Sequence, residues 1–168
     1  MIREVLTYPH PLLKKKAESV TEITPELREL AKDMAETMYE YEGIGLAAPQ
    51  VGESLRMVTV DITGPEERGD LRVLINPELE HVGEEVESEE GCLSVEDYRA
   101  PVTRAERVRV KALDLDGNPV EFEAEDILAI CLQHECDHLD GKLFIDRISR
   151  LKRTMYDAKV KKWARQSR

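Results

Sequence analysis

The sequence lacks three features, and each absence argues against a different class of protein. It has no uncharged apolar stretch approaching the roughly 20 residues that span a bilayer. Its first residues, MIREVLTYPHP, lack the cationic start and apolar run of a signal peptide. It has only three cysteines, an odd number that argues against a disulfide framework and for reduced thiols. We therefore expect a cytoplasmic protein with no membrane association.

Positive charge is scarce over most of the chain and concentrated at its end. From Arg147 onward, nine Lys or Arg residues stand against the single acid Asp157, a local charge of +8. The total of −11 then leaves −19 on residues 1–146. Such an acidic body repels nucleic acid phosphates, so we expect no DNA binding by the main domain.

The length of 168 residues and the apolar content of 41% fit one compact domain. The sequence has no internal repeat, low-complexity tract or evident linker. We therefore predict a single domain over residues 1–168, which includes a basic C-terminal helix at about 149–165. In that segment Leu151, Met155 and Ala158 recur at helical spacing, which predicts its apolar face.

Helical and strand patterns occur in mixed order along the chain. Thr24 is a good N-cap, and the apolar residues after it repeat at helical spacing up to Gly43. Residues 55–62 and 71–79 indicate strands, and the alternation on both sides of the Asp116–Gly117 turn predicts a hairpin. These elements predict an α+β fold, with mostly antiparallel strands packed around a central helix that carries the pattern H-E-x-x-H.

The pattern H-E-x-x-H lies in CLQHECDHLDG, residues 131–141. A helix brings residues four apart to one face, so His134 and His138 can direct their imidazoles at a single metal ion. A catalytic centre of this kind has three protein ligands and an open position for water. The rest of the chain must therefore supply one more donor.

The region downstream of the motif has no suitable donor. After His138 there is no further histidine and no glutamate, and Phe144 stands where one metalloprotease pattern places its third histidine. The metalloprotease interpretation therefore loses its ligand. Upstream, His10 lies between prolines and His81 on an acidic segment, and both fit ordinary surface residues better than ligands.

Cys92 is the best remaining donor because of its setting in EGCLS. Gly91 lets the backbone turn closely, and a thiolate is a strong ligand for zinc or ferrous iron. An isolated cysteine here would fit a small buried apolar residue equally well. Cys131 faces the same side of the helix as His134 and is expected to border the site. Cys136 faces the opposite side and is expected in the core.

The loop GIGLAAPQ, residues 43–50, satisfies the dinucleotide fingerprint G-x-G-x-x-A. That pattern requires a strand before it and a helix after it. Here a helical pattern precedes the loop, Pro49 would interrupt a helix after it, and Asp61 comes too early to bind a ribose. We reject a nucleotide site. Gly43 and Gly45 would instead allow close approach of the backbone to a peptide. An apolar loop with no binding role would have the same composition.

Three separated motifs together resemble the peptide deformylase family. They occur in order as GIGLAAPQ (Gly43–Gln50), EGCLS (Glu90–Ser94) and HECDH (His134–His138). The N-terminal YPHPLL and the later LFIDRIS are also similar to that family, so the resemblance covers most of the chain. Cys136 departs from the aliphatic residue or methionine that members usually carry. Since that position points away from the metal, it puts little in doubt beyond sensitivity to oxidation.

The resemblance implies a set of roles for individual residues. Glu135 would be the catalytic acid and base, and Gln50 with the backbone NH of Leu93 would stabilise a developing oxyanion. The implied substrate is the formylmethionyl end of a newly made protein, with formate released. The implied metal ligands are Cys92, His134 and His138, and the implied substrate-binding residues are Ile44, Gly45, Glu90, Arg99, Ile130 and Cys131. For the last four of these residues a purely structural role would fit equally well.

The resemblance also implies a cofactor and a partner. The cofactor would be one divalent metal, Fe2+ before the alternatives Zn2+, Ni2+ and Co2+, because a thiolate with two imidazoles suits all four. The partner would be the ribosome, where a basic C-terminal helix could follow RNA phosphate. A solvated terminal helix that merely offsets the acidic body is the simpler alternative for the same residues.

Two other classes of protein remain open from the sequence alone. A general metallopeptidase would cleave internal amide bonds, and the missing downstream ligand argues against it. A structural metal protein would close the site with a fourth ligand, and the sequence offers no obvious one.

Overall fold

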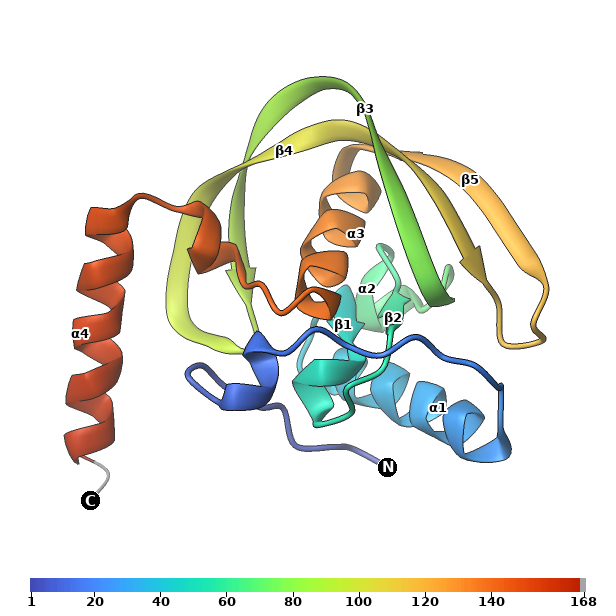
Figure 1. Cartoon of the computed structure of the whole chain (residues 1–168), viewed down its shortest axis with the longest axis horizontal. Coiled ribbons are helices and arrows are strands. Elements are labelled where there is room, and N and C mark those ends of the chain that lie inside the picture. The colour runs from blue at the N-terminus through green and yellow to red at the C-terminus, as the bar shows by residue number, and fades with distance from the viewer. Residues whose placement is uncertain (167–168) are drawn as a thin grey trace.

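The computed structural model describes residues 1–166 and forms an α+β fold around one antiparallel sheet. Figure 1 shows the order and arrangement of its elements. Within residues 1–166, no helix combines the length and apolar character needed to cross a bilayer. The elements are η1 (Pro11–Lys14), α1 (Pro25–Glu40), β1 (Gly45–Ala47), η2 (Ala48–Val51), β2 (Met57–Val60), α2 (Gly64–Glu67), β3 (Arg72–Cys92), β4 (Val95–Leu113), β5 (Pro119–Glu125), α3 (Asp126–Leu139), η3 (Phe144–Arg147) and α4 (Arg150–Gln166).

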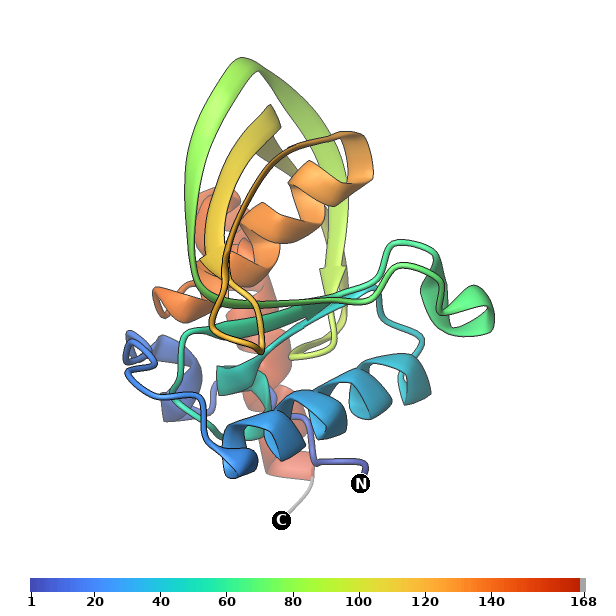
Figure 2. The same cartoon turned by 90° about the vertical axis from the view of Figure 1, so that its right-hand side faces the viewer.

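The sheet runs in the order β1-β2-β3-β4-β5 and every neighbouring pair is antiparallel. Strands β3 and β4 form a long hairpin whose pairing extends from Ile75↔Leu113 to Cys92↔Val95. Its register shifts at three places, between Ile75/Glu78, Val82/Glu85 and Gly91/Cys92. Such irregularities bend a strand pair, and the hairpin accordingly arches over α3 in Figures 1 and 2.

Helix α3 lies beneath this arch and contacts β1, β2, β4 and β5. Its apolar side packs Leu128, Ala129 and Leu132 into the main core between helix and sheet. The buried Gln133 fixes the helix to β4, because its amide accepts a hydrogen bond from Ala105 N at 2.9 Å and donates one to Ala105 O at 2.8 Å. The side of α3 that carries the histidines is thereby held toward the end of the β3–β4 hairpin.

Helix α1 forms where the sequence predicts it. The Thr24 hydroxyl accepts a hydrogen bond from Leu27 N at 3.1 Å and caps the first turn. The buried stripe that includes Leu30, Met34 and Met38 packs against β1 and β2 in a second core. Figure 2 shows α1 on the side of the sheet away from the arch. The α+β class, the antiparallel strands and the C-terminal helix predicted from the sequence are confirmed.

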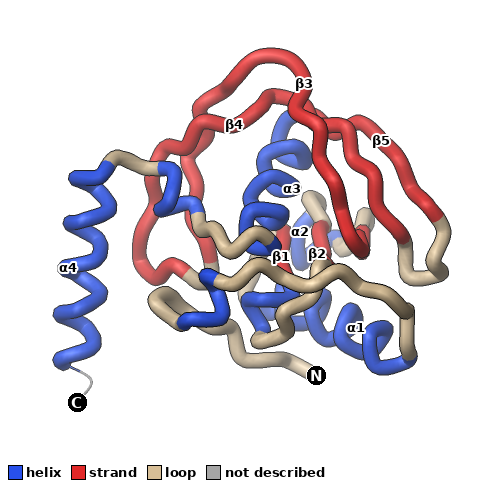
Figure 3. The backbone as a smooth tube through the Cα atoms, viewed as in Figure 1, coloured by secondary structure: helices blue, strands red, loops and turns tan. Residues whose placement is uncertain are grey.

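The predicted strand bounds differ from the observed ones, too short for β3 and too long for β2. The segment predicted at 71–79 is the start of β3, which runs on to Cys92, and β2 covers only Met57–Val60 of the predicted 55–62. Most residues of β3 between positions 80 and 89 are exposed. Because that part of the hairpin is joined to β4 by backbone pairing and has no buried face, it shows no apolar alternation. Figure 3 shows the strand geometry continuing through the arch.

Helix α4 is present, but its predicted apolar face is wrong. Leu151 and Met155 are 71% and 65% exposed, whereas Tyr156 is 2% exposed. The helix docks through aromatic contacts, with the Tyr156 ring centroid 4.9 Å from that of Tyr98 and 6.1 Å from that of Tyr8. The Tyr156 hydroxyl also donates a hydrogen bond to Glu96 O at 3.0 Å. Aromatic side chains therefore select the packed face, in preference to the aliphatic ones.

Candidate metal centre

Three potential metal donors meet where the β3–β4 hairpin approaches α3. Cys92 is the last residue of β3, and His134 and His138 lie one helical turn apart on α3. One ligand atom from each lies within 4.8 Å of the other two. Cys92 Sγ is 3.4 Å from His138 Nε2, and the two imidazole rings meet edge to face with centroids 5.1 Å apart. The structure thus brings together the three residues that the sequence analysis selected as ligands.

The donor set fits a divalent metal ion. Bonds of about 2.0–2.3 Å to one ion place ligand atoms roughly 3–4 Å apart, which agrees with the observed separation of sulfur and nitrogen. Among residues 1–166, no fourth His, Cys, Asp or Glu joins this group. An ion held by three side chains would keep one position open to water, as a catalytic centre requires.

Glu90 orients the first imidazole. Its carboxylate accepts a hydrogen bond from His134 Nδ1 at 2.8 Å, which leaves Nε2 of that ring free to bind an ion. The same carboxylate accepts two hydrogen bonds of 2.7 Å from Arg104. Burial alone would raise the pKa of Glu90, but these hydrogen bonds lower it below the ordinary value. Glu90 was predicted to bind substrate, yet its carboxylate is committed to this pairing.

A chain of ion pairs continues behind Glu90. Arg104 donates to Asp137 at 2.7 Å, and Asp137 also accepts hydrogen bonds of 2.6 and 2.8 Å from Arg147. The side chain of Arg104 is 2% exposed. Since a buried charge is tolerated when it is paired and hydrogen-bonded, this network can hold the histidine rigidly from behind.

Glu135 is buried like Glu90 but lacks the hydrogen bonds that Glu90 makes. It is 5% exposed, and its Oε1 has no hydrogen-bond partner within the described part of the chain. His138 Nε2 lies 4.0 Å from that oxygen, beyond hydrogen-bond distance. Burial raises the pKa of Glu135 to about 7. A carboxyl group poised near neutrality beside three metal donors is suited to accept and return a proton.

Gln50 and Leu93 lie next to the thiol. The Gln50 side chain is anchored by Ala47 N, which donates to its Oε1 at 2.9 Å. Its Nε2 donates to Ser94 Oγ at 3.1 Å and lies 3.6 Å from Cys92 Sγ. This amide is therefore preorganised beside the donors. Leu93 occupies the turn that immediately follows Cys92, and it lines the same cleft as Gln50.

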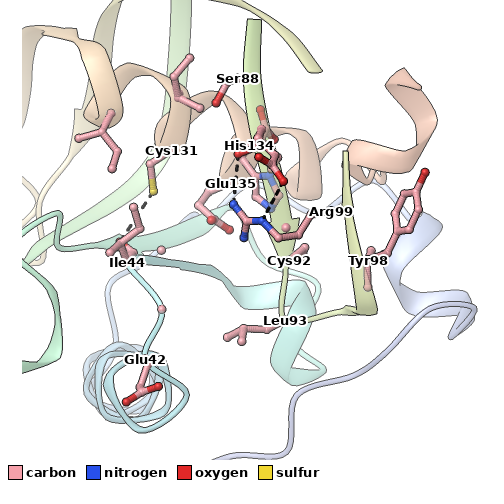
Figure 4. Close-up of a pocket in the computed structure, with 18 of the residues that line it drawn as sticks. Glu42, Ile44, Ser88, Cys92, Leu93, Tyr98, Arg99, Cys131, His134 and Glu135 are labelled. Atoms are coloured by element: carbon pink, nitrogen blue, oxygen red, sulfur yellow. Dashed lines mark hydrogen bonds and ion pairs between the residues drawn. The ribbon is translucent and has the colours of Figure 1, made fainter. Parts of the chain in front are cut away.

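Cys92 and His134 line a cleft of about 910 Å³, and His138 is buried behind them, outside its lining. Its floor is the side of α3 from Ile127 to Glu135, one wall is the segment from Tyr41 to Gly45, and the other wall is the part of β3 from Val86 to Gly91. Figure 4 shows Cys131, His134 and Glu135 directed into it. The residues predicted from the sequence that line the cleft are Ile44, Gly45, Gln50, Glu90, Cys92, Leu93, Arg99, Ile130, Cys131, His134 and Glu135.

Gly45 has a steric reason to be glycine. A Cβ atom at this position would lie 2.6 Å from Glu135 Oε2 and 2.7 Å from Cys131 Sγ. The missing side chain therefore lets β1 approach the floor of the cleft. Other predicted residues are placed less closely: Arg99 is largely exposed and pairs with Glu89 at 3.5 Å. Cys136, expected in the core, is only partly buried.

The residues that support the centre were not predicted from the sequence. Arg104 bonds to Glu90, 14 positions away, and to Asp137, 33 positions away, so no local sequence pattern predicts these contacts. Ser94 was quoted only as part of a motif, although its hydroxyl accepts the hydrogen bond of Gln50. The only signal in the sequence was the position of Asp137 directly before a predicted ligand.

Comparison with known proteins identifies one family. The family model for polypeptide deformylase matches residues 2–154. A peptide deformylase of Acidobacterium capsulatum is 50% identical over 165 residues, which are 98% of this chain and 97% of that protein. A peptide deformylase of Thermodesulfovibrio yellowstonii is 51% identical over 160 residues, covering 95% of this chain and 97% of that one.

Solved structures agree with the sequence comparison. The crystal structure of a peptide deformylase from Legionella pneumophila has a TM-score of 0.92 and 46% identity, and the match covers 99% of this chain and 98% of that one. The structure of the Ehrlichia chaffeensis peptide deformylase in complex with actinonin has a TM-score of 0.88 and 38% identity, with 96% of each chain covered.

Proposed function

Since this chain belongs to the peptide deformylase family of enzymes, we propose that it is a metal-dependent hydrolase that removes the formyl group from the N-terminal formylmethionine of newly synthesised proteins. The products are formate and a free amino terminus. The observation that carries this proposal is the grouping of Cys92, His134 and His138 beside the buried Glu135, whose Oε1 has no hydrogen-bond partner within residues 1–166.

Cys92, His134 and His138 would hold the ion. When bound, a divalent metal supplies a water of lowered pKa and polarises a carbonyl oxygen. Glu135 accepts the proton of the attacking water and then gives it to the departing amine nitrogen. The Gln50 amide and the backbone NH of Leu93 donate hydrogen bonds to the oxyanion, and each such donor lowers the barrier by about 3 kcal/mol.

The substrate would lie along the cleft as an extended chain. The methionine side chain would enter the apolar part of the floor at Ile130 and Cys131, while the backbone would run beside Ile44 and Gly45. Extended peptides bind in this way by adding hydrogen bonds to exposed strand edges. The close approach of β1 to Glu135 at Gly45 supports this placement, because it brings the bound backbone near the proposed base.

Ferrous iron is the metal we propose for the enzyme in the cytoplasm. A thiolate with two imidazoles also suits Zn2+, Ni2+ and Co2+, so each ion needs to be tested separately. Protein stripped by a chelator should lose activity and recover it when Fe2+ is added without oxygen. Exposure to peroxide should abolish recovery, because the thiolate of Cys92 is oxidisable.

Formate release from formyl-Met-Ala tests the activity directly. Protein loaded anaerobically with Fe2+ should release formate and leave the Met-Ala bond intact. Acetyl-Met-Ala and unformylated Met-Ala-Ser are the matched controls, and neither should be cleaved. Cleavage between Met and Ala without formate would instead identify a general metallopeptidase.

We also propose that α4 docks on the ribosome through its basic residues. Tyr156 fixes the helix to the body, which leaves Lys152, Lys161 and Lys162 exposed. Basic side chains in this arrangement can follow RNA phosphates. Reversal of two charges, Lys161→Glu with Lys162→Glu, should weaken co-sedimentation with ribosomes and leave formate release from formyl-Met-Ala unchanged. The same reversal at the exposed Lys15 and Lys16 is the control.

A further inference from the structure

The N-terminal segment joins two parts of the chain that lie next to Cys92. Leu6 N donates a hydrogen bond to Gln50 O at 2.7 Å, and Tyr8 N donates one to Ser94 O, also at 2.7 Å. Gln50 lies in η2, and Ser94 lies 44 positions later in the turn between β3 and β4. In Figure 1 the N-terminal segment passes beneath the end of that hairpin. Residues 6–8, here called the strap, therefore span both parts.

The strap holds the same two residues whose side chains meet. Gln50 Nε2 donates to Ser94 Oγ at 3.1 Å, and Gln50 Oε1 accepts from Ala47 N at 2.9 Å. Both Gln50 and Ser94 are buried. The two backbone bonds of the strap and the side-chain bond form a closed ring of contacts, which sets how far Gln50 lies from the turn that carries Leu93. The separation of the two proposed oxyanion donors thus depends on the strap.

Tyr8 also connects the strap to α4. Its hydroxyl donates a hydrogen bond to Asp157 Oδ1 at 2.6 Å and accepts one from Arg153 Nη2 at 3.2 Å. The Arg153 guanidinium lies 5.2 Å from the centroid of the Tyr8 ring. Phenylalanine would pack on the same neighbours, but only the hydroxyl fixes where the ring lies along α4. Tyr8 is thus held by its side chain to the helix and by its backbone to Ser94.

We propose that Tyr8 is a positioning residue for the oxyanion donors, which it holds in place through the strap while α4 holds Tyr8. The inference rests on the proposed function, because the donors are the Gln50 amide and the Leu93 NH of that reaction. Loss of one such donor costs about 10²-fold or more in kcat, and a small displacement costs part of that factor. Tyr8 does not line the cleft, so its effect should fall on kcat and not on substrate binding.

The first test is Tyr8→Phe, which keeps the ring and removes both hydrogen bonds to α4. Its kcat for formyl-Met-Ala should fall about 5-fold, whereas its KM and its metal affinity should not change. Asp157→Ala removes one partner of the hydroxyl from the side of the helix. Its kcat should fall about 3-fold, because Arg153 still holds the hydroxyl.

The matched control is Tyr156→Phe. It removes the hydroxyl of a neighbouring tyrosine, one that donates to Glu96 O at 3.0 Å and has no bond to the strap. Both Tyr→Phe changes should lower the midpoint of thermal unfolding alike, because each removes the hydroxyl that joins α4 to the body. Only Tyr8→Phe should lower kcat. An equal fall of kcat in the control would overturn the proposal.

A double-mutant cycle distinguishes positioning from a general loss of structure. Tyr8→Phe is measured again in the Gln50→Ala background, where one of the donors that it positions is already missing. The two changes should be non-additive, so Tyr8→Phe should lower kcat less than about 2-fold there. A fall of about 5-fold in both backgrounds, or no fall in the wild-type background, would overturn the proposal.

A measurement without catalysis separates this inference from the reaction. If the wild type releases no formate, the proposed function is wrong, but the setting of the Gln50 side chain can still be observed by nuclear magnetic resonance. The chain has three glutamines, Gln50, Gln133 and Gln166. In zinc-loaded protein with isotopically labelled glutamine, Tyr8→Phe should shift the side-chain amide signals of Gln50 and leave those of Gln133 unchanged, because Gln133 is anchored on β4. Unchanged Gln50 signals, or equal shifts at both residues, would overturn the inference.

Discussion

Two carboxylates on either side of His134 are both buried, yet their surroundings differ completely. Glu90 belongs to a paired side, made of Glu90, Arg104, Asp137 and Arg147, in which every carboxylate accepts short hydrogen bonds. Glu135 belongs to an open side, made of Glu135 and the cleft, where its Oε1 has no partner among the described residues. The pKa of Glu90 is lowered, while burial raises the pKa of Glu135 to about 7.

The contrast distinguishes carboxylates that hold a metal ligand in place from a carboxyl group that can transfer a proton. A fully paired buried charge stays ionised and keeps its neighbours in one geometry, which suits the orientation of a metal ligand. An unpaired buried carboxyl titrates near neutrality and can move a proton. Asp137 of the paired side and Glu135 of the open side lie within one turn of α3, and substitutions on the two sides should have different consequences.

The largest effect is expected on the open side. Glu135→Gln keeps the shape of the side chain but cannot transfer a proton, so kcat should fall by about 10³-fold. The bound metal and the midpoint of thermal unfolding should change little. Formate release and metal analysis on the same preparation would check this. A loss of less than tenfold would mean that Glu135 is not the base.

The next effect is expected on the paired side. Arg104→Met leaves Glu90 and Asp137 buried without their shared partner, and we expect a loss of about 3 kcal/mol in the free energy of unfolding. Urea unfolding of metal-free protein would measure it. Arg109→Met, on the same strand, removes an exposed arginine whose contact with Glu80 is 3.5 Å long. That control should cost less than about 0.5 kcal/mol.

A smaller effect is expected at Glu90, which joins the paired side to His134. Glu90→Gln retains a hydrogen-bond acceptor for His134 but removes the negative charge, which should weaken metal binding about 10-fold to 100-fold. Competition with a chelator of known affinity would measure the change. The control is Glu89→Gln, a change at the exposed residue next to Glu90, and it should leave metal affinity unaltered. Equal affinities in the two variants would show that the paired side does not support the ligand.

The open side could be predicted from the sequence, because its residues follow local rules. His134, Glu135 and His138 share a helix, and their spacing alone places them together. Cys92 could be selected by elimination, since few other donors remained. Helix α1 followed equally from the cap at Thr24 and the repeat of apolar residues after it. In each case one segment contained the whole signal.

The paired side could not be predicted, because it depends on the register of the hairpin. Arg104 is paired with Val86 and reaches Glu90 four residues further along β3, in a register that the shift between Gly91 and Cys92 sets from the turn. The exposed arch of that hairpin has no buried face, so the length of β3 could not be predicted from apolar alternation either. The packed face of α4 could not be predicted for a related reason, because its aromatic partners Tyr8 and Tyr98 come from distant parts of the chain.

The smallest predicted effect is on how the free energy of unfolding depends on pH, to which Glu135 and Glu90 should contribute with opposite signs. The pKa of Glu135 in the folded protein lies near 7, above the ordinary value of 4.5. Its contribution to stability is therefore present below the ordinary pKa and is lost as the pH rises through about 7. In metal-free protein, the free energy of unfolding of Glu135→Gln should therefore rise relative to that of the wild type between pH 5 and pH 8.5.

Glu90→Gln is the matched control for that pH dependence, because the lowered pKa of Glu90 gives a contribution present above the ordinary value and lost as the pH falls. This variant should be less stable than the wild type at pH 8.5, and the gap should narrow as the solution is acidified below the ordinary value. Urea unfolding at both pH values would measure the two differences. If Glu135→Gln shifted stability equally at pH 5 and pH 8.5, its carboxyl would not be titrating between them, and the contrast between the two sides would fail.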